Sequence, residues 1–358
     1  MGELVDVCSG RDYKHLSEGD IPVYGTGGYM LSVSEALSYD KDAIGIGRKG
    51  TIDKPYILNA PFWTVDTLFY AIPKEKVDLN FAFDIFQNIN WKKKDESTGV
   101  PSLSRTAINE IHILVPQYDE QQVLGQLFYG IDRLIALHQR KLDKMKELKK
   151  AFLNLIFSQK LRFYGFTDSW ELRKLEEVAP LRGGYAFQSN QYANEGIPIV
   201  RISNILSDGS VGGEFVFHNE LKDDEIFMLE NGDIVLAMSG ATTGKVSILS
   251  SEKSCKYYQN QRVGLFSKTA TCNYSFVATI VRSEKFLEQL RDVLVAGAQP
   301  NVSAKDIDAF DFSVPKDVEE QSQIGNFFRT LDRLITLYQK KIDSSKEMKK
   351  ILLKNMLI

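Results

Sequence analysis

The strongest constraint on the fold of this chain is an internal repeat at an offset of 200 residues. Residues 120–150 match residues 320–350 at roughly half of the positions, and Gly125 aligns with Gly325. A repeat of this length implies a structural unit that occurs twice. The fold must therefore be built from two similar halves.

Both copies of the repeat carry apolar residues at alternating steps of four and three. The seam positions are Leu124, Phe128, Ile131, Ile135, His138, Leu142, Met145, Lys149, Phe152 and Ile156, and Ile324, Phe328, Leu331, Ile335, Tyr338, Ile342, Ser345, Lys349, Leu352 and Met356. This spacing predicts two long helices that pack along the a/d seam of a coiled coil. Lys149 and Lys349 are polar exceptions, and we expect the neighbouring Leu148 and Met348 to take over the packing there.

The repeat continues upstream of each helix with lower similarity. The matching segments are 100–104 with 299–303, 42–47 with 233–238, and 1–4 with 175–178. A strand-like run that ends in Val-Pro then leads into each helix, at residues 111–116 and 310–315. The repeating unit is therefore a β-rich domain followed by a long helix.

The globular halves consist of short β-branched or aromatic runs separated by Gly, Asn and Asp, such as residues 197–202 and 263–266. This pattern is typical of strands, whereas residues 283–295 are expected to form a helix. We therefore predict an α+β fold with four segments. They are a first domain over 1–116, a long helix over 117–158, a second domain over 159–315 and a second long helix over 316–358.

Composition excludes several classes of protein. No apolar run approaches the roughly 20 residues of a membrane helix, and the N-terminus lacks the pattern of a signal peptide, so we expect a cytoplasmic protein without membrane contact. Cys8, Cys255 and Cys272 form no CxxC pair and fit reduced thiols better than a disulfide framework or a zinc site. The net charge of -3 means that any nucleic-acid contact must come from local clusters of cations.

Residues 239–245 invite comparison with a phosphate-binding P-loop. The pattern is broken, because its first glycine would fall at Ser239 and Val246 replaces the Ser or Thr that should bind magnesium. Two interpretations remain open. The loop either brings backbone amides and Lys245 to a DNA phosphate, or it is a plain tight turn.

Other catalytic motifs are absent from the sequence. No two prolines are adjacent, so the Asn/Asp-Pro-Pro-aromatic loop of a DNA methyltransferase is missing. The Glu-x-Lys triplets at Glu147 and Glu347 lie on the heptad helices, where a solvated face explains them. His138 aligns with Tyr338 on the seam and is expected to be packed. We therefore expect neither catalytic residues nor a metal site.

Several motifs, in their order and duplication, give the chain a resemblance to the specificity subunits of type I restriction-modification enzymes. In the second half they are residues 170–175, 231–235, 239–245, 299–303 and 315–321, and in the first half residues 22–29 and 47–51. The resemblance covers essentially the whole chain. Family members usually carry a lead-in like Trp170–Lys174 before the first domain as well, and this sequence starts at Met1, after the corresponding point.

This resemblance implies a non-catalytic protein with two target-recognition domains. They would be separated by two long antiparallel coiled-coil helices, with internal pseudo-two-fold symmetry. The partners implied are double-stranded DNA with a bipartite, asymmetric target and two methyltransferase subunits. S-adenosylmethionine would be carried by those subunits, with no cofactor in this chain, and whether restriction subunits join stays open. The alternative is a coiled-coil adaptor without base-specific recognition, which explains the helices but not two unlike domains with polar, Gly-rich loops.

Candidate DNA-contacting residues are cations for phosphates and amides, hydroxyls or guanidinium groups for base edges. The predicted set is Tyr24, Thr26, Tyr29, Arg48, Lys49, Thr51, Lys93, Ser102, Arg105, Arg182, Arg201, Asn204, Ser239, Thr242, Thr243, Lys245, Tyr258, Gln259, Asn260, Gln261, Arg262, Asn301 and Ser303. The segment 257–262 is the richest in such groups. Its alternative interpretation is a buried strand whose amides are satisfied internally.

Overall fold

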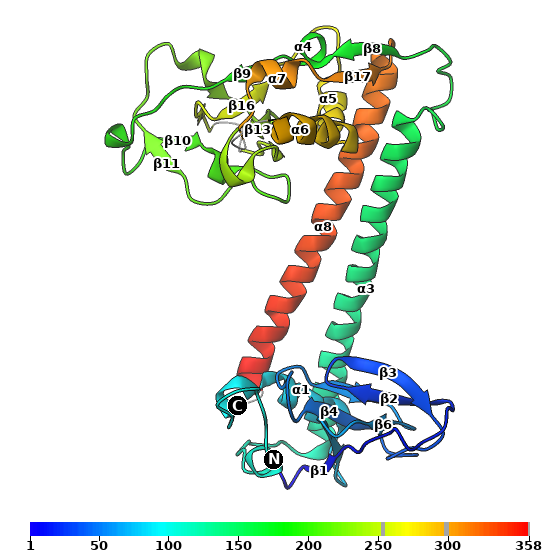
Figure 1. The fold of residues 1–358 in the computed structure, drawn as a ribbon. Helices are drawn as coiled ribbons and strands as arrows, with labels where there is room; N and C mark the ends of the chain where they lie inside the picture. Colours follow the sequence, from blue (N-terminus) through cyan, green and yellow to red (C-terminus); the bar gives the residue numbers. More distant parts are fainter. Residues whose placement is uncertain (252–254, 297–300, 357–358) are drawn as a thin grey trace. The chain divides into compact units, whose positions relative to one another are not determined.

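The computed structural model describes residues 1–251, 255–296 and 301–356 (Figure 1). Gln299 and Pro300 of the second-half motif lie outside these ranges. The chain divides into two compact units, and each long helix contributes to both of them. Unit 1 is Met1–Asp143 with Leu337–Ile358, and unit 2 is Lys144–Thr336.

Two helices of 40 and 39 residues dominate the repeat, α3 (Tyr118–Phe157) and α8 (Val318–Met356). In unit 1, Lys349 pairs with Asp132 and the rings of His138 and Tyr338 lie 5.7 Å apart. The residue numbers rise on α3 as they fall on α8, so the helices run antiparallel. Unit 2 has the same arrangement, as the pairs of Lys149 with Asp332 and of Phe152 with Phe327 show. The predicted antiparallel seam is confirmed within each unit.

The two lysines of the seam do not behave as expected. Leu148 and Met348 are 42% and 57% exposed, so they do not replace Lys149 and Lys349 in the packing. Instead each lysine stays in its heptad position and pairs with an aspartate of the other helix. A side chain at a heptad seam position points toward the other helix, so the two lysines cannot turn outward to solvent. Their charges are compensated by the aspartates of the other helix instead.

The far end of the second seam also differs from the heptad pattern. Met356 is 41% exposed, whereas Leu353 is buried. The predicted seam position at Met356 is therefore wrong.

The main sheet of unit 1 is antiparallel with the strand order β1-β7-β4-β5. Its strands are β1 (Val5–Ser9), β7 (Leu68–Pro73), β4 (Ala43–Gly47) and β5 (Tyr56–Leu58). A smaller sheet consists of β3 (Gly28–Val33), β2 (Ile21–Gly25) and β6 (Trp63–Thr64). Three helical elements complete the domain: α1 (Leu79–Asn88), η1 (Trp91–Lys94) and α2 (Arg105–Asn109). Apolar residues of β4 and α1, including Ile44, Ile46, Phe81 and Phe86, form its core.

The main sheet of unit 2 has the order β14-β13-β16-β9 and is also antiparallel. Its strands are β14 (Val246–Ile248), β13 (Ile234–Ala237), β16 (Val263–Phe266) and β9 (Leu181–Gly183). The second sheet contains β11 (Val216–His218), β10 (Ile197–Val200), β15 (Tyr257–Gln259) and β12 (Met228–Leu229). A third pair joins β17 (Asp311–Val314) to β8 (Glu171–Lys174).

Short helical segments connect these strands. The α-helices are α4 (Leu175–Val178), α5 (Tyr274–Ile280), α6 (Glu284–Ala296) and α7 (Ala304–Asp308), and the 3-10 segments are η2 (Ser189–Gln191), η3 (Ile202–Asn204), η4 (Asp224–Ile226) and η5 (Gly240–Thr242). The helix expected over 283–295 is therefore present as α6. Together with the sheets, these elements confirm the α+β fold.

The two units share a topology that their sequences only partly reveal. The order β1-β7-β4-β5 corresponds to β9-β16-β13-β14, and each second sheet contains one parallel pair, β2 with β6 and β10 with β15. Ser104 and Ser303 each cap the short helix that follows, accepting the N–H of Ala107 and of Asp306. The repeat therefore extends through both domains.

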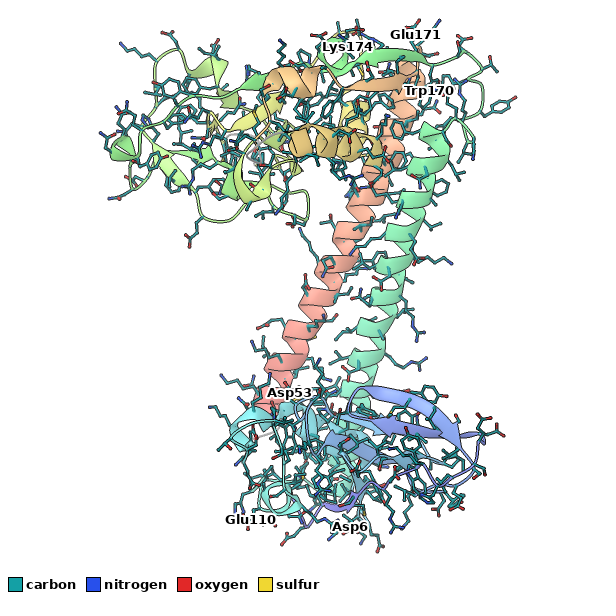
Figure 2. All side chains as sticks on the ribbon, in the orientation of Figure 1. Asp6, Asp53, Glu110, Trp170, Glu171 and Lys174 are labelled. Atoms are coloured by element: carbon teal, nitrogen blue, oxygen red, sulfur yellow. The ribbon has the colours of Figure 1, made fainter. Side chains whose placement is uncertain are left out.

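The units differ where the chain leads into the long helices. Within residues 310–315, Asp311–Val314 form β17 because β8 pairs with them, but residues 111–116 form no strand and Leu114 is 79% exposed. The expected strand there is wrong, since an isolated run of β-formers needs a neighbouring strand for its backbone hydrogen bonds. Trp170 lies directly before β8 (Figure 2). It donates its indole N–H to the buried Glu320 (3.3 Å), which also forms a bidentate pair with Arg162.

Three further observations bear on the sequence expectations. All three cysteines are free thiols, and burial raises the pKa of Cys272 to about 12. Across the described ranges, no helix is long and apolar enough to cross a membrane. Within the same ranges, no cluster of three or more His, Cys, Asp or Glu side chains could hold a metal ion.

Candidate nucleic-acid interface

In unit 1, the ends of β1 and β4 and the start of β7 lie together at one edge of the main sheet. The Arg48 N–H donates to Thr67 O (2.8 Å), and the Leu103 N–H donates to Arg48 O (2.9 Å). These bonds fix the segment after β4 between the turn before β7 and the lead into α2. We call the exposed or half-buried side chains there edge 1; they are Arg48, Lys49, Thr67, Ser102 and Arg105.

Most of the cations predicted for the first domain lie on edge 1. Lys49 forms a β-bridge with Ser102, and Arg105 reaches the end of β1, where its guanidinium donates to Ser9 Oγ (3.1 Å). Arg48 packs over the Phe69 ring, with its guanidinium carbon 5.7 Å from the ring centroid. Thr51 is half-buried in the same turn, its carbonyl against Gly47. Edge 1 is therefore a cationic surface with interspersed hydroxyl groups.

The β2–β3 hairpin tip extends this surface. The Val65 N–H donates to Tyr24 O (3.0 Å), so the hairpin lies beside the turn between β6 and β7. Thr26, Tyr29 and Thr67 line one open pocket there, and Tyr29 is 63% exposed. The structure thus brings the predicted Tyr24, Thr26 and Tyr29 next to edge 1.

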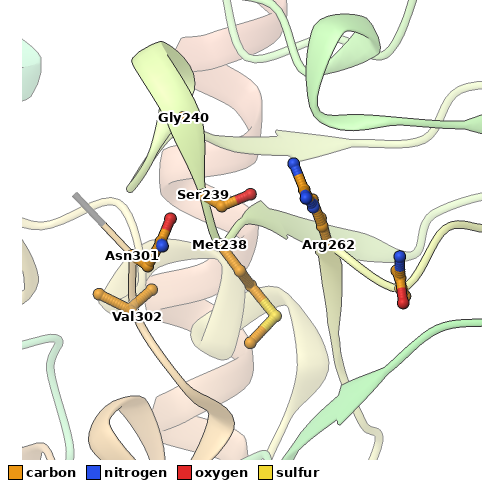
Figure 3. Close-up of a pocket in the computed structure, with 7 residues that line it drawn as sticks. Met238, Ser239, Gly240, Arg262, Asn301 and Val302 are labelled. Atoms are coloured by element: carbon orange, nitrogen blue, oxygen red, sulfur yellow. The ribbon is translucent and has the colours of Figure 1, made fainter. Parts of the chain in front are cut away.

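Unit 2 builds the equivalent surface with other side chains. The Met238 N–H donates to Arg262 O (3.0 Å), and the Val302 N–H donates to Met238 O (2.9 Å), which repeats the pattern around Arg48. Figure 3 shows the resulting pocket, formed where the ends of β13 and β15 meet the lead into α7. We call its polar side chains edge 2; they are Ser239, Gln261, Arg262 and Asn301.

Edge 2 presents hydrogen-bonding groups toward solvent. Gln261, Arg262 and Asn301 are exposed. The Ser239 hydroxyl oxygen is buried and has no hydrogen-bond partner among the described residues. Asn260 Oδ1 accepts the Arg262 N–H (3.2 Å), which holds the turn in place. This hydrogen bond therefore fixes the backbone of the turn that carries Gln261 and Arg262.

Three of the predicted DNA-contacting residues belong to the core of unit 2 instead. Tyr258 donates to the buried Asp224 carboxylate (2.6 Å), and Gln259 Nε2 donates to Val263 O (2.7 Å). Asn204 Nδ2 donates to backbone carbonyls of Gly212 and Glu214 (3.0 and 2.9 Å). All three side chains are buried. The alternative of a buried strand is therefore correct for Tyr258 and Gln259, although only the Nε2 group of Gln259 is paired and its Oε1 has no hydrogen-bond partner among the described residues.

The glycine-rich loop after β13 contains the tight turn of one interpretation, and its contact with a DNA phosphate stays a prediction. Its threonines satisfy the backbone, with Thr242 Oγ1 donating to Ile202 O (3.1 Å) and Thr243 Oγ1 to Gly240 O (2.7 Å). Ser239 and Gly240 line the edge 2 pocket, whereas Lys245 is half-buried just before β14. Part of the loop is a tight turn and part lines the surface.

The remaining predicted residues are more scattered. Arg182 is half-buried in β9, with its guanidinium donating to Met228 O (3.4 Å), and Arg201 is half-buried directly after β10. Ser303 binds Asp306 as the cap of α7. Lys93 is exposed in η1, and no described contact brings it to edge 1.

The turn between β6 and β7 of unit 1 was not among the sites predicted from the sequence. Asp66 and Thr67 lie where Gln261 and Arg262 lie in unit 2, since each pair follows a strand parallel to its neighbour and precedes the second strand of the main sheet. The offset is 195 at this point, compared with 174 at the front of the domains and 200 in the helices. Only the topology identifies this correspondence, because the matching stretches are too short and too different to align by residue type.

The fold and its surfaces define a class of protein. It has two α+β units of the same topology whose edges carry different side chains, and two similar long helices that run antiparallel within each unit. Residues 1–147 and 167–345 match the family model of the type I restriction modification DNA specificity domain, and the chain belongs to this family.

Known relatives agree with this assignment. The chain is similar to the type I restriction enzyme MjaVIII specificity subunit of Methanocaldococcus jannaschii, with 24% identity over 72% of this chain and 64% of the relative. It is also similar to the EcoAI specificity subunit of Escherichia coli, with 24% identity over 62% of this chain and 38% of the relative. The matches therefore span less than two thirds of the length of either relative.

A solved structure shares the fold. The crystal structure of the S subunit of a type I restriction-modification system from M. genitalium covers 100% of this chain and 94% of its own, with a TM-score of 0.76 and 15% identity. This likeness concerns the fold, and it includes both domains and both long helices.

Proposed function

We propose that this chain is the DNA-recognition subunit of a type I restriction-modification complex and that edges 1 and 2 each read one half of a bipartite target. The observation that carries the proposal is the duplication of one backbone framework with different exposed side chains. Family membership and the specificity subunits among the relatives support it. The chain itself performs no catalysis in this proposal.

The side chains of the two edges fit different base edges. Arginine pairs with guanine through O6 and N7, and glutamine or asparagine pairs with adenine through N6 and N7. Edge 1 offers Arg48 and Arg105, whereas edge 2 offers Gln261, Arg262 and Asn301. Because these sets differ, the two halves of the target are expected to differ as well.

The chemistry would reside in partner subunits. Two methyltransferase subunits would bind S-adenosylmethionine and extrude the target base from double-stranded DNA, as enzymes that modify bases must do. This chain would position them by holding the DNA. Restriction subunits would join the same assembly in a complete restriction system.

The first prediction tests the DNA contact in the complex assembled with its methyltransferase subunits. Gln261→Ala and Arg262→Ala should relax discrimination at particular base pairs by about 1–3 kcal/mol each, because they remove contacts to base edges. Lys245→Ala should instead weaken binding similarly for all sequences and flatten the salt dependence, because a phosphate contact carries no sequence information. Salt titrations on cognate and non-cognate duplexes measure both effects.

The alternative function, a coiled-coil adaptor, predicts another result. A complex that assembles with its methyltransferase subunits but binds cognate and non-cognate duplexes equally would support the adaptor. Unchanged discrimination in the Gln261 and Arg262 variants would show that the DNA surface lies away from edge 2. An unchanged salt slope for Lys245→Ala would show that the loop after β13 does not contact a phosphate.

A further inference from the structure

A glycine follows the first strand of each main sheet, Gly10 after β1 and Gly184 after β9. Each glycine lies directly against the backbone carbonyls at the end of another strand, β6 or β15, and of the turn after it. A Cβ atom on Gly10 would lie 2.0 Å from Val65 O and 2.6 Å from Thr64 O. A Cβ atom on Gly184 would lie 2.3 Å from Gln259 O and 2.5 Å from Asn260 O. Only glycine allows two backbones to approach so closely. The chain after β1 and β9 is therefore pressed against the turns that carry edges 1 and 2.

The residue after each of these two glycines is held by equivalent backbone hydrogen bonds in the two units. The Arg11 N–H donates to Thr64 O (2.8 Å), and the Tyr185 N–H donates to Gln259 O (2.9 Å). Tyr185 O also accepts the N–H of Gln261 (2.8 Å), the central residue of edge 2. Arg11 and Tyr185 thus occupy the same place in the two units, and neither was among the residues predicted from sequence.

Tyr185 has a fixed, accessible ring. The side chain is 45% exposed, and its ring lies 4.8 Å from that of Phe227 and 4.9 Å from that of Phe187, measured between centroids. Phe187 and Phe227 are buried, so they form a rigid support. An aromatic side chain that is already ordered loses little entropy when it contacts a ligand.

Arg11 offers different chemistry at the equivalent place. Its side chain is exposed, and its backbone is fixed on both sides because its carbonyl accepts the Trp63 indole N–H (2.9 Å). No ion pair to its guanidinium is found within the ranges that the structure describes. The planar guanidinium therefore keeps its donors available for a bidentate acceptor such as the O6/N7 edge of guanine.

We infer that Arg11 and Tyr185 are specificity-determining residues of the two half-sites, Arg11 by pairing with a guanine edge and Tyr185 by placing its ring against a thymine methyl group. The inference rests on the proposed function. It follows from the position that these residues share beside the turns of edges 1 and 2 and from the chemistry of their exposed side chains.

The experiment compares the methylation targets of complexes assembled with the methyltransferase subunits. A randomised plasmid library, methylated by each complex and sequenced, gives the preference at every base pair. Arg11→Ala and Arg11→Lys should each reduce discrimination at one base pair of one half-site by about ten- to a hundredfold, because lysine keeps the charge but not the bidentate fork. Tyr185→Ala should do the same at one base pair of the other half-site, and Tyr185→Phe should retain the wild-type preference.

Matched controls separate these effects from general damage. Lys41→Ala removes an exposed cation just before β4, at the end of that strand opposite to Arg48, and Tyr164→Ala removes a fully exposed tyrosine of the segment before β8. Both should leave the target unchanged. Thermal unfolding of every variant checks that the chain is folded.

The outcomes distinguish the inference from the function on which it rests. If the wild-type complex methylates a bipartite target and the alanine variants keep its full discrimination, the inference is wrong and the proposed function stands. Full discrimination by Arg11→Lys alone would show that a positive charge at residue 11 suffices without the guanidinium fork, and it would also overturn the assignment of Arg11 as a bidentate reader of guanine. A wild-type complex without sequence preference would refute both.

Discussion

Among single residues, Lys349 shows most clearly how this fold handles a polar group in an apolar seam. Its side chain is 10% exposed, and its ammonium group donates to both carboxylate oxygens of Asp132 (2.7 and 2.6 Å) and to Gln87 Oε1 (2.6 Å). Asp84 lies 3.8 Å away and is also buried. Burial raises the pKa of Asp84 to about 8, an effect that the charge of Lys349 opposes. Lys349 therefore pairs with the Asp132 carboxylate and lies beside the buried carboxyl group of Asp84.

This arrangement predicts that Lys349→Met destabilises unit 1. Removing Lys349 leaves the Asp132 carboxylate without its cation, and because that side chain is 36% exposed the expected cost is about 1–3 kcal/mol, less than for a fully buried pair. Lys350→Met is the matched control, because the Lys350 side chain is 80% exposed and its contact with Glu347 is 4.0 Å long, so a change within about 0.5 kcal/mol is expected. Chemical denaturation of the two variants measures the difference. Equal stabilities would show that Lys349 is dispensable in the seam.

At the scale of secondary-structure elements, each long helix docks on its domain by a duplicated contact. Gln121 Oε1 accepts the N–H of Asp78, the cap of α1, and Gln321 Oε1 accepts the N–H of Asn273, the cap of α5 (3.2 and 2.7 Å). The Nε2 groups donate to Pro116 O and Pro315 O (3.0 and 2.8 Å). Gln121 and Gln321, at equivalent positions of the repeat, thus tie the two long helices to their domains.

A glycine one turn further allows the close approach of these elements. A Cβ atom on Gly125 would lie 2.4 Å from Asp78 Oδ1 and 2.8 Å from the backbone nitrogen of Phe81, so Gly125→Ala should destabilise the chain. Gly130 lies in the same helix with no atom within 4 Å of an added Cβ, and Gly130→Ala should stabilise it by about 0.5–1 kcal/mol through helix propensity. Thermal unfolding of both variants tests the opposite signs. Stabilisation by both substitutions would contradict the docking contact.

At the scale of the whole molecule, each unit has its own hydrophobic core and its own edge. Replacing residues 168–315 by the corresponding domain of another family member should therefore change one half of the methylated target and leave the other half unchanged. Replacing residues 1–116 is the reciprocal experiment and should change the opposite half. Sequencing of methylated DNA gives the result directly, and a change of both halves after either replacement would show that the units do not read independently.

Much of this architecture is predictable from the sequence. The heptads predict both long helices and their seam. A helix of this length packs through an apolar stripe, and the spacing of the apolar residues in the sequence shows that stripe directly. The strand runs that become β10 and β16, and the helix α6, were likewise expected from residue type. The cations of edge 1 and the Gln261-Arg262 pair of edge 2 were in the predicted set because they carry the groups that bind DNA.

Other features depend on contacts between distant segments. Tyr258 and Gln259 have the chemistry of base readers, but their inward direction in β15 and their partners at Asp224 and Val263 place them in the core. Residues 111–116 and 311–314 have similar strand propensity, yet only the latter pair with β8.

The sequence alone determined the repeat, the helices and the kinds of side chain available, because periodicity and residue type are local properties. The tertiary structure decided which of those side chains reach the surface. It also decided that Lys149 and Lys349 stay in the seam, and that Arg11 and Tyr185 share one place beside the turns of the two edges. The physical reason is that burial and hydrogen-bond partners come from strands and helices far apart in the chain, which no local pattern records.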